Sequence, residues 1–360
     1  FFSAVFALTR VFNCATELEN ENANNNTREV AHLVNGALQA LCKDSPMIQE
    51  SLYEYLDVIL NFNRDLKNPI SGFTVLTNIF LNNSKLCDSI PADLGNDIIR
   101  AVRMRMNTKE FSGTLLNPLM ALIICDNQPI RRNQRIVMNA LWEDQNHKLL
   151  ILFNAKGVGT PEMLKKLMSK ASKDVFGAVT GPLGYYVALL HLLSACCRGK
   201  ATVEEVKCKS LFTFRELVST ICDVDTVWLV KLPLLTLLYD SYLDSDLHGE
   251  GVETMQNDMP ALLNECLRIL EDSTIIEFFN NDNNGGNAAA SDGGKEPSKE
   301  EVAAKSSWAQ AEPQQVQKMF NGILDYIVCG IAAIVGQELY IHAGTWFFFF
   351  FSIFFSLFFL

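Results

Sequence analysis

A short phrase recurs along this chain: an apolar run ends in a cysteine, and a polar turn then leads into another run with helical character. The phrase begins at Leu41 (LCKDSPMIQESL), Leu86 (LCDSIPADLGND), Ile124 (ICDNQPIRRNQR) and Cys196 (CCRGKATVEEVK). Its cysteines lie 45, 38 and 72 residues apart, at Cys42, Cys87, Cys125 and Cys197. A period of ~40 to 47 residues is typical of helical-pair solenoids, whose units bury their apolar faces only by stacking. The spacing predicts an all-α fold, an armadillo/HEAT-like α-solenoid of stacked helical pairs, and favours a scaffold over a catalyst.

Helix signals dominate between the two ends of the chain. Pro46 and Pro161 stand where a first helical turn would begin, and a proline costs nothing there because its missing N–H would have no partner. Further helices are expected at 28–42, 93–106, 113–125, 130–143, 213–223, 231–243 and 259–279. Pro233 follows an apolar run, so we expect a helix break near Lys231. The run GYYVALLHLLSACC is apolar on every face, which predicts a helix inside the stack.

Composition narrows the class of protein. A net charge of -11 argues against nucleic acid as a partner, because binding needs a positive surface. The chain has 10 cysteines in 360 residues, too few for a disulfide scaffold, and most lie in apolar runs. They are expected to be reduced thiols that pack as small apolar side chains, in a reducing compartment.

Composition also divides the chain. Residues 1–280 are expected to form the armadillo-like α-solenoid, and 281–313, rich in Asn, Gly, Ser and charge, a disordered linker. Residues 314–343 resume a helical pattern and predict a further helix or helix pair. Residues 344–360 form a Phe-rich tail whose apolar run is shorter than the ~17 residues that a spanning helix needs. We interpret this tail as a translated noncoding stretch, and a short membrane anchor is the alternative.

A search for reactive groups yields no site. Asp244, Asp246 and Gly249 take three positions of a calcium loop, but His248 and Met255 replace two of its ligands. Calcium binding is therefore not expected there.

Other candidates also have a structural explanation. His191, Cys196 and Cys197 share one apolar helix and no second ligand pair follows, so we expect buried structural residues rather than zinc ligands. Gly157 and Gly159 lack the rest of a phosphate-binding loop. His32, His147, His248 and His342 are scattered without a nucleophile motif.

Three basic clusters are expected to be solvated helix faces: Arg100, Arg103 and Arg105; Arg131, Arg132 and Arg135; Lys165, Lys166, Lys170 and Lys173. We predict no catalytic, cofactor-binding or metal-binding residue, no cofactor and no enzymatic activity.

Three segments resemble a known family in order and spacing. They are NIFLNNSKLCDSI (78–90), the segment from Tyr185 to Asp225, and VKLPLLTLLYDSYLDSD (230–246). The most specific piece is GKATVEEVKCKSLFTFREL, with Lys200, Glu205, Lys207, Cys208, Ser210 and Leu211 in matching places. The chain resembles the cytosolic armadillo region of inositol trisphosphate receptors, which carries an RIH domain shared with the more distant ryanodine receptors. Pro233 and the Phe-rich tail depart from the family's pattern.

The resemblance implies a regulatory segment of a tetrameric calcium-release channel of the endoplasmic reticulum membrane. Such a segment lies on the cytosolic side, contacts other domains and subunits of the channel, and relays ligand binding to the pore. The ligand and pore sites are expected outside this chain. Two alternatives stay open, an independent armadillo-like adaptor for a protein partner and a protein anchored in the membrane by the Phe-rich tail.

Overall fold

The computed structural model describes most of the chain between residues 21 and 268. The described residues are 21–64, 71–107, 111–143, 149–154, 159–169, 181–245, 257–258, 260–262, 264–265 and 268. The chain divides into two compact units, 1–310 and 311–360, and every described residue belongs to the first. The predicted linker, the helix or helix pair at 314–343 and the Phe-rich tail lie outside the described residues, so these domain assignments stay predictions.

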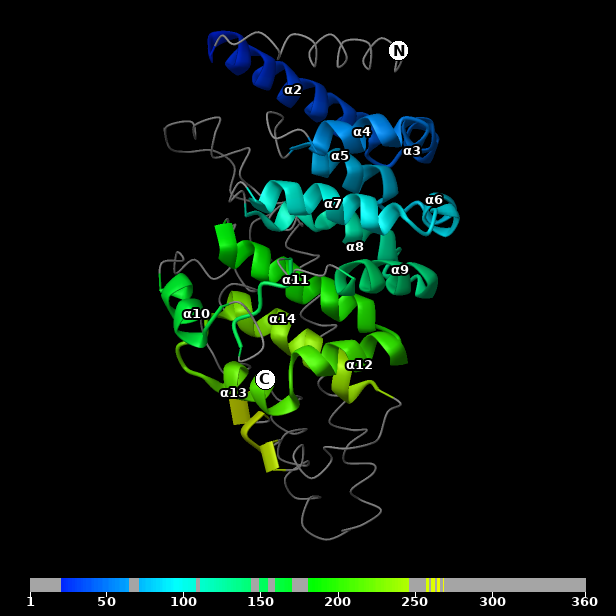
Figure 1. Ribbon diagram of the computed structural model, residues 1–360. Helices are drawn as coiled ribbons and strands as arrows, with labels where there is room; N and C mark the ends of the chain where they lie inside the picture. Colours follow the sequence, from blue (N-terminus) through cyan, green and yellow to red (C-terminus); the bar gives the residue numbers. More distant parts are fainter. Residues whose placement is uncertain are drawn as a thin grey trace, which may run out of the picture. The chain divides into compact units, whose positions relative to one another are not determined.

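The described residues are predominantly helical, which confirms the all-α fold class (Figure 1). The first helices are α2 (Glu21–Cys42), α3 (Pro46–Tyr53), α4 (Leu56–Arg64), α5 (Ser71–Phe80), α6 (Ser84–Ser89) and α7 (Leu94–Asn107). The 3-10 turn η1 (Gly113–Leu115), α8 (Asn117–Ile123), the short strands β1 (Ile124–Cys125) and β2 (Gln128–Pro129), and α9 (Arg131–Trp142) follow. The last elements are α10 (Pro161–Met168), α11 (Gly181–Cys197), α12 (Thr202–Leu211), α13 (Phe214–Cys222), α14 (Trp228–Leu238) and the π-helical turn η2 (Tyr239–Leu243).

Helices that are close in sequence pack on one another in steps. In Figure 1, α5 lies between α2 and α8, and it packs against both. The helices α7 and α8 then pack on α9, α8 and α9 on α11, and α11 on α12 and α14. A stack of helical pairs would give this order of contacts, because each pair covers the apolar face of the next. The regular superhelix of an armadillo or HEAT solenoid stays a prediction.

Three buried amide side chains, which we call the bridging amides, tie these steps together. Each donates two hydrogen bonds to backbone carbonyl oxygens near the ends of other helices, where intrahelical donors run out. Gln49 of α3 donates to Asn78 O (2.8 Å) and Leu81 O (3.1 Å) around the end of α5. The other two lie on α9: Asn133 donates to Cys87 O and Leu122 O, and Gln134 to Ala195 O and Arg198 O, at 2.7 to 2.8 Å. The bridging amides therefore couple helix ends that are distant in sequence.

The four phrase cysteines are buried, but they do not occupy equivalent positions. Cys42 and Cys197 end α2 and α11, whereas Cys87 lies within α6 and Cys125 in β1. The common feature is the turn to the next helix that follows each cysteine. Non-glycine residues with positive φ make several of these turns, among them Asp44 (φ 55°) and Lys200 (φ 67°).

Most of the predicted helices are confirmed to within a few residues, and two need correction. The helix expected at 113–125 is instead η1, α8 and strand β1, since Asp126 (φ 49°) and Asn127 (φ 62°) form the tight turn of a hairpin. The break expected near Lys231 is wrong, because α14 runs from Trp228 through Pro233 without interruption. The proline removes a single helical donor, and burial of the surrounding leucines offsets that loss. Part of the helix predicted at 259–279 lies outside the described residues.

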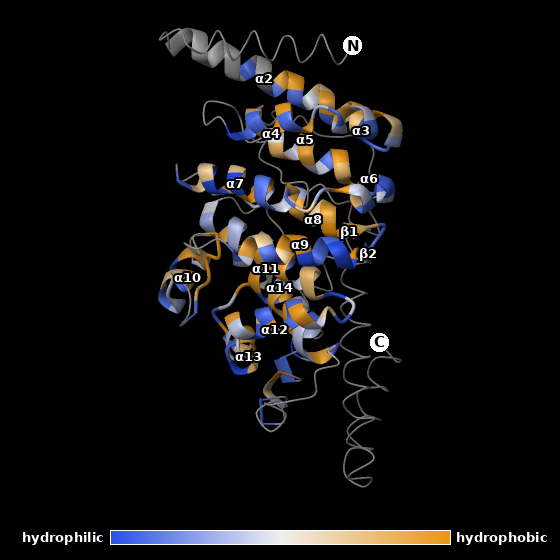
Figure 2. Cartoon of the chain, turned by 45° about the vertical axis from the view of Figure 1, so that its right-hand side comes forward, coloured by the Kyte–Doolittle hydropathy of each residue, from blue (hydrophilic) through white to orange (hydrophobic). Residues whose placement is uncertain are grey.

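Helix α11 is the interior helix that its all-round apolar sequence predicts. Its residues from Leu183 to Cys197 are almost all buried, on every side of the helix. Figure 2 shows the contrast with α9, whose polar start is blue, while α8 and α11 carry mostly hydrophobic residues. The end of α11 is nevertheless the place where buried polar groups of four elements meet.

Candidate functional site

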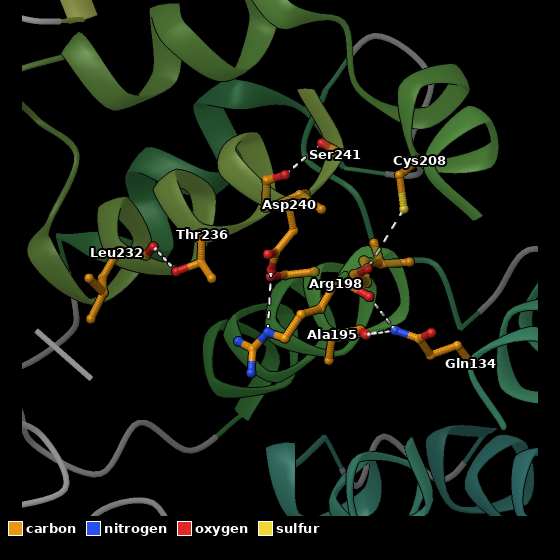
Figure 3. Close-up of polar contacts among 11 residues, drawn as sticks. Gln134, Ala195, Arg198, Cys208, Leu232, Thr236, Asp240 and Ser241 are labelled. Carbon is orange, nitrogen blue, oxygen red and sulfur yellow. Dashed lines mark hydrogen bonds and ion pairs between the residues drawn. The ribbon is translucent and has the colours of Figure 1, made fainter. Parts of the chain in front are cut away.

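The candidate site is a buried polar junction at the end of α11, formed with α9, α12 and η2 (Figure 3). At its centre the Oδ2 atom of Asp240, on η2, accepts a hydrogen bond from the Ser194 hydroxyl of α11. The same oxygen lies 3.9 Å from Nε of Arg198, just past the end of α11. Asp240 is 2% exposed. The junction therefore holds a carboxylate inside the protein with one hydrogen bond and one more distant cation.

Helix α12 holds the far end of η2. The Glu205 carboxylate, fully buried on α12, accepts a hydrogen bond from the hydroxyl of Ser245. Lys209 donates to the same hydroxyl at 3.0 Å, and its ammonium lies 5.2 Å from the centre of the Tyr242 ring. Tyr242 OH donates to Phe212 O at 2.7 Å. These contacts fasten the segment after α14 to α12 by its side chains.

Helix α9 closes the junction from the other side. The bridging amide Gln134 holds Ala195 O and Arg198 O, as Figure 3 shows, and Arg131 donates to Gly199 O. Lys207 of α12 donates to Oδ1 of Asn139 at 2.6 Å. The end of α11 is thus held from α9 and η2 at once, and α12 is tied to both.

Burial shifts the pKa values of the central groups. Burial raises the pKa of Asp240 from 3.8 to about 6, which outweighs the lowering by Arg198 and by the hydrogen bond from Ser194. Asp244 and Glu205 raise this pKa further because like charges oppose ionisation. Burial lowers the pKa of Lys209, while Glu205 acts in the opposite direction. The junction therefore holds ionisable groups whose charged forms are disfavoured by their surroundings.

The histidine and cysteines singled out from the sequence lie beside this junction. Cys196 and Cys197 are fully buried, and His191 is half-buried on the same helix. Burial and the nearby Arg198 lower the pKa of His191 to about 4, so its ring is neutral at pH 7. Burial raises the pKa of the Cys196 thiol, and a hydrogen bond with Cys208 together with burial raises that of Cys197. Thiols with raised pKa values are poor nucleophiles and poor metal ligands.

The remaining candidates are not brought together. Asp244 follows η2, whereas Asp246, Gly249, His248, Met255 and Gly157 lie outside the described residues. Gly159 packs closely, since a Cβ there would lie 2.3 Å from Cδ1 of Phe153, and this contact explains the glycine. Exposed His32 pairs with the Ser71 hydroxyl, and Nδ1 of His32 lies 3.3 Å from Oγ of Ser71.

In the part of the chain that the structure describes, no group of three His, Cys, Asp or Glu side chains is placed to hold a metal ion. Absence of a catalytic or metal site from the whole chain stays a prediction.

The basic clusters need one correction. Arg131, Arg132 and Arg135 on α9 are exposed as expected, and Arg132 donates to Ile90 O at 2.7 Å. Arg105 is fully buried, although its cluster was expected to be a solvated face. Its Nε donates to Asn63 O at 3.0 Å in the last turn of α4, where the free carbonyls of a helix end attract a cation.

Lys165 and Lys166 of the third basic cluster lie in the last turn of α10. Lys165 pairs with Asp223 (2.9 Å) and Asp225 (3.2 Å), so α10 is linked to the end of α13. Lys170 and Lys173 lie outside the described residues. Exposed arginines and lysines here contact neighbouring segments of the same unit.

The sequence pointed to the region of the junction but not to its central residues. Glu205 stood out only within the family segment, and Asp240, Ser194 and Gln134 carried no signal of their own. On α12 the residue types predict the opposite of what the structure shows, since adjacent Glu204 and Glu205 are buried while Val203 and Val206 are exposed. Carboxylates on the inner face of a short helix indicate polar partners in the interior.

Comparisons with known proteins show two similarities. Residues 2–153 match the family model of the RIH domain. A 216-residue stretch is 26% identical to the inositol 1,4,5-trisphosphate receptor itr-1 of Caenorhabditis elegans. The chain is therefore similar to an inositol trisphosphate receptor and carries a match to the RIH domain. The resemblance found in the sequence is thereby confirmed.

The two matches differ in extent. The RIH domain match ends at residue 153, before the segments from Tyr185 onward that carry the most specific resemblance. The stretch similar to the worm receptor covers 58% of this chain and 7% of that protein. The chain therefore spans a small part of its relative's length. None of the described helices combines the length and the apolar character needed to cross a bilayer.

Proposed function

We propose that this chain is a non-catalytic coupling segment of an intracellular ligand-gated calcium-release channel that relays ligand binding to the pore. The observation that carries the proposal is its similarity to an inositol trisphosphate receptor over 216 residues. By this proposal the segment lies on the cytosolic side of the endoplasmic reticulum membrane. Its partners are other domains and subunits of the same homotetrameric channel, and the ligand and pore sites lie outside it.

The packing of the described unit supports a mechanical role. The bridging amides Gln49, Asn133 and Gln134 fix successive helices to one another at their ends. Closely packed elements that are tied in this way move as bodies and do not deform continuously. A movement imposed on one end of such a unit is passed to the other end, which is what a relay needs.

The test separates ligand binding from channel opening in the full-length channel that carries this segment. Gln134→Leu removes the bridge from α9 to the end of α11, and Gln128→Leu at the exposed Gln128 of β2 is the matched control. We expect Gln134→Leu to keep the affinity for inositol trisphosphate while reducing calcium release per bound ligand by about tenfold, if about 1.4 kcal/mol of coupling is lost. Calcium release from permeabilised cells is measured at matched channel abundance.

Two results would contradict the relay. One is calcium release by Gln134→Leu equal to that of Gln128→Leu at every ligand concentration. The other is a chain that purifies from its native source bound to an unrelated protein and not assembled into a channel, which favours the adaptor. A loss of ligand affinity equal to the loss of release would place the defect in binding instead of coupling.

A further inference from the structure

Asp240 lies at the centre of the junction on η2, and η2 packs against α11, α12 and α14. Its Oδ2 atom accepts from Ser194 of α11, and Arg198 stays 3.9 Å away, beyond hydrogen-bonding distance. Only 2% of Asp240 is exposed, so water contributes little to its solvation. Burying a charge is costly unless it is paired and hydrogen-bonded, and Asp240 has the hydrogen bond from Ser194 and a cation that stays more distant.

The charges around Asp240 come from each element that packs on it. Helix α11 contributes the thiol of Cys197 and is followed by Arg198, α12 contributes Glu205, and Asp244 follows η2 itself. The charged residue of α14 is Lys231, which pairs with Glu265. Burial and the two carboxylates raise the pKa of Asp240, and together they outweigh the lowering by Arg198 and by the hydrogen bond from Ser194, so this pKa is about 6.

The sign of the resulting pH dependence follows from linkage. The pKa of Asp240 is higher in the folded protein than the ordinary 3.8, so folding favours the protonated acid. This contribution to stability is fully present below about pH 4, and it is lost as the pH rises through about 6. Mild acidification therefore strengthens the fold at this position.

The turn η2, which carries Asp240, is suited to respond to a change in the charge of this side chain. The turn η2 is π-helical, a rare and less favourable geometry that occurs often at functional sites. Side-chain contacts attach it to α11 through Ser194 and to α12 through Tyr242 and Phe212. A change in the charge of Asp240 acts directly on the contact with α11.

We propose that the contact between α11 and η2 is a proton-sensitive latch, which tightens when Asp240 is protonated and loosens when it is ionised. The latch is independent of the relay function, since it depends on contacts within this unit. Its effect is to couple the packing of η2 against α11 to the pH around the protein.

The experiment follows thermal unfolding of the full chain from about pH 8 to about pH 5. The wild-type midpoint temperature is expected to rise as the pH falls through about 6, and Asp240→Asn is expected to lose this component. Equal pH dependence of the wild type and Asp240→Asn would overturn the latch.

Two further variants keep the test decisive if Asp240→Asn does not fold. In selectively labelled protein, the carboxyl carbon of Asp240 is titrated by NMR, with an expected midpoint near 6. Glu205→Gln removes a neighbouring negative charge and is expected to lower that midpoint, whereas Arg198→Gln is expected to raise it. A role in packing alone would not move the midpoint in opposite directions. A midpoint near 4 in all three proteins would refute the proposal.

Discussion

The bridging amide Gln49 offers the sharpest test of how the helical steps are joined. Gln49 is 3% exposed and makes three hydrogen bonds through its side chain. Its Nε2 donates to Asn78 O and Leu81 O, and its Oε1 accepts from Nδ2 of Asn83 at 2.9 Å. The Oδ1 atom of Asn83 in turn accepts from Leu86 N and caps the start of α6. Replacement by leucine of similar size removes all three bonds.

The size of the destabilisation follows from the hydrogen-bond partners that Gln49→Leu leaves unsatisfied. The Asn83 amide is buried, and leaving a buried donor unsatisfied costs about 1 to 3 kcal/mol. The two carbonyl contacts are partly buried, so each loss costs about 0.5 to 1 kcal/mol. The apolar leucine side chain returns about 1 kcal/mol through its burial. We therefore expect Gln49→Leu to lower the free energy of unfolding by about 2 kcal/mol.

Urea unfolding followed by circular dichroism measures this loss as a lower midpoint at an unchanged slope. Gln128→Leu on exposed Gln128 is the control, and it is expected to change stability by less than about 0.5 kcal/mol. Hydrogen exchange adds a local readout, because Gln49→Leu should speed exchange in the first turn of α6. Equal midpoints for the two variants, with unchanged exchange in α6, would refute the account of the bridging amides.

Three further outcomes are expected. Thr213→Ala removes the capping box of α13, in which Thr213 and Glu216 satisfy each other's backbone N–H groups, and lowers stability by about 1 kcal/mol in the same urea assay. Leu189→Ala leaves a cavity at a fully buried position of α11 and lowers stability by about 2 to 5 kcal/mol, and a smaller loss would mean that the site can collapse. In native protein the partly buried Cys222 reacts with a thiol reagent before Cys196, whose thiol is buried with a raised pKa; the reverse order would contradict the packing of α11.

Features that depend on neighbouring residues could be predicted from the sequence. Pro46 and Pro161 each begin a helix, and Thr160 accepts from Met163 N to cap the second one. The uniform apolar surface of α11 indicated burial on all sides, because solvent would select polar residues on an exposed face. Helix type and interior position therefore follow from local chemistry.

Features that depend on residues far apart in the chain could not be predicted from the sequence. Gln49 and its carbonyl partners are 29 and 32 residues apart, and Gln134 and Arg198 are 64 apart, so no short pattern connects them. The helical spacing of Arg105 with Arg100 and Arg103 predicts a solvated face, whereas a carbonyl of α4 holds Arg105 inside the protein. Pro233 predicts a break, but packing against α11 buries its neighbours and offsets the lost hydrogen bond, and this packing cannot be seen in the local sequence.

The complete burial of α11 also has a consequence for biosynthesis. Helix α11 is synthesised before α14, so the part of its apolar surface that α14 covers stays exposed while the chain grows as far as Leu238. At ~5 to 20 residues per second this interval lasts on the order of seconds. During this interval nascent α11 exposes an apolar face, and a chain released within α12 or α13 would be prone to aggregate.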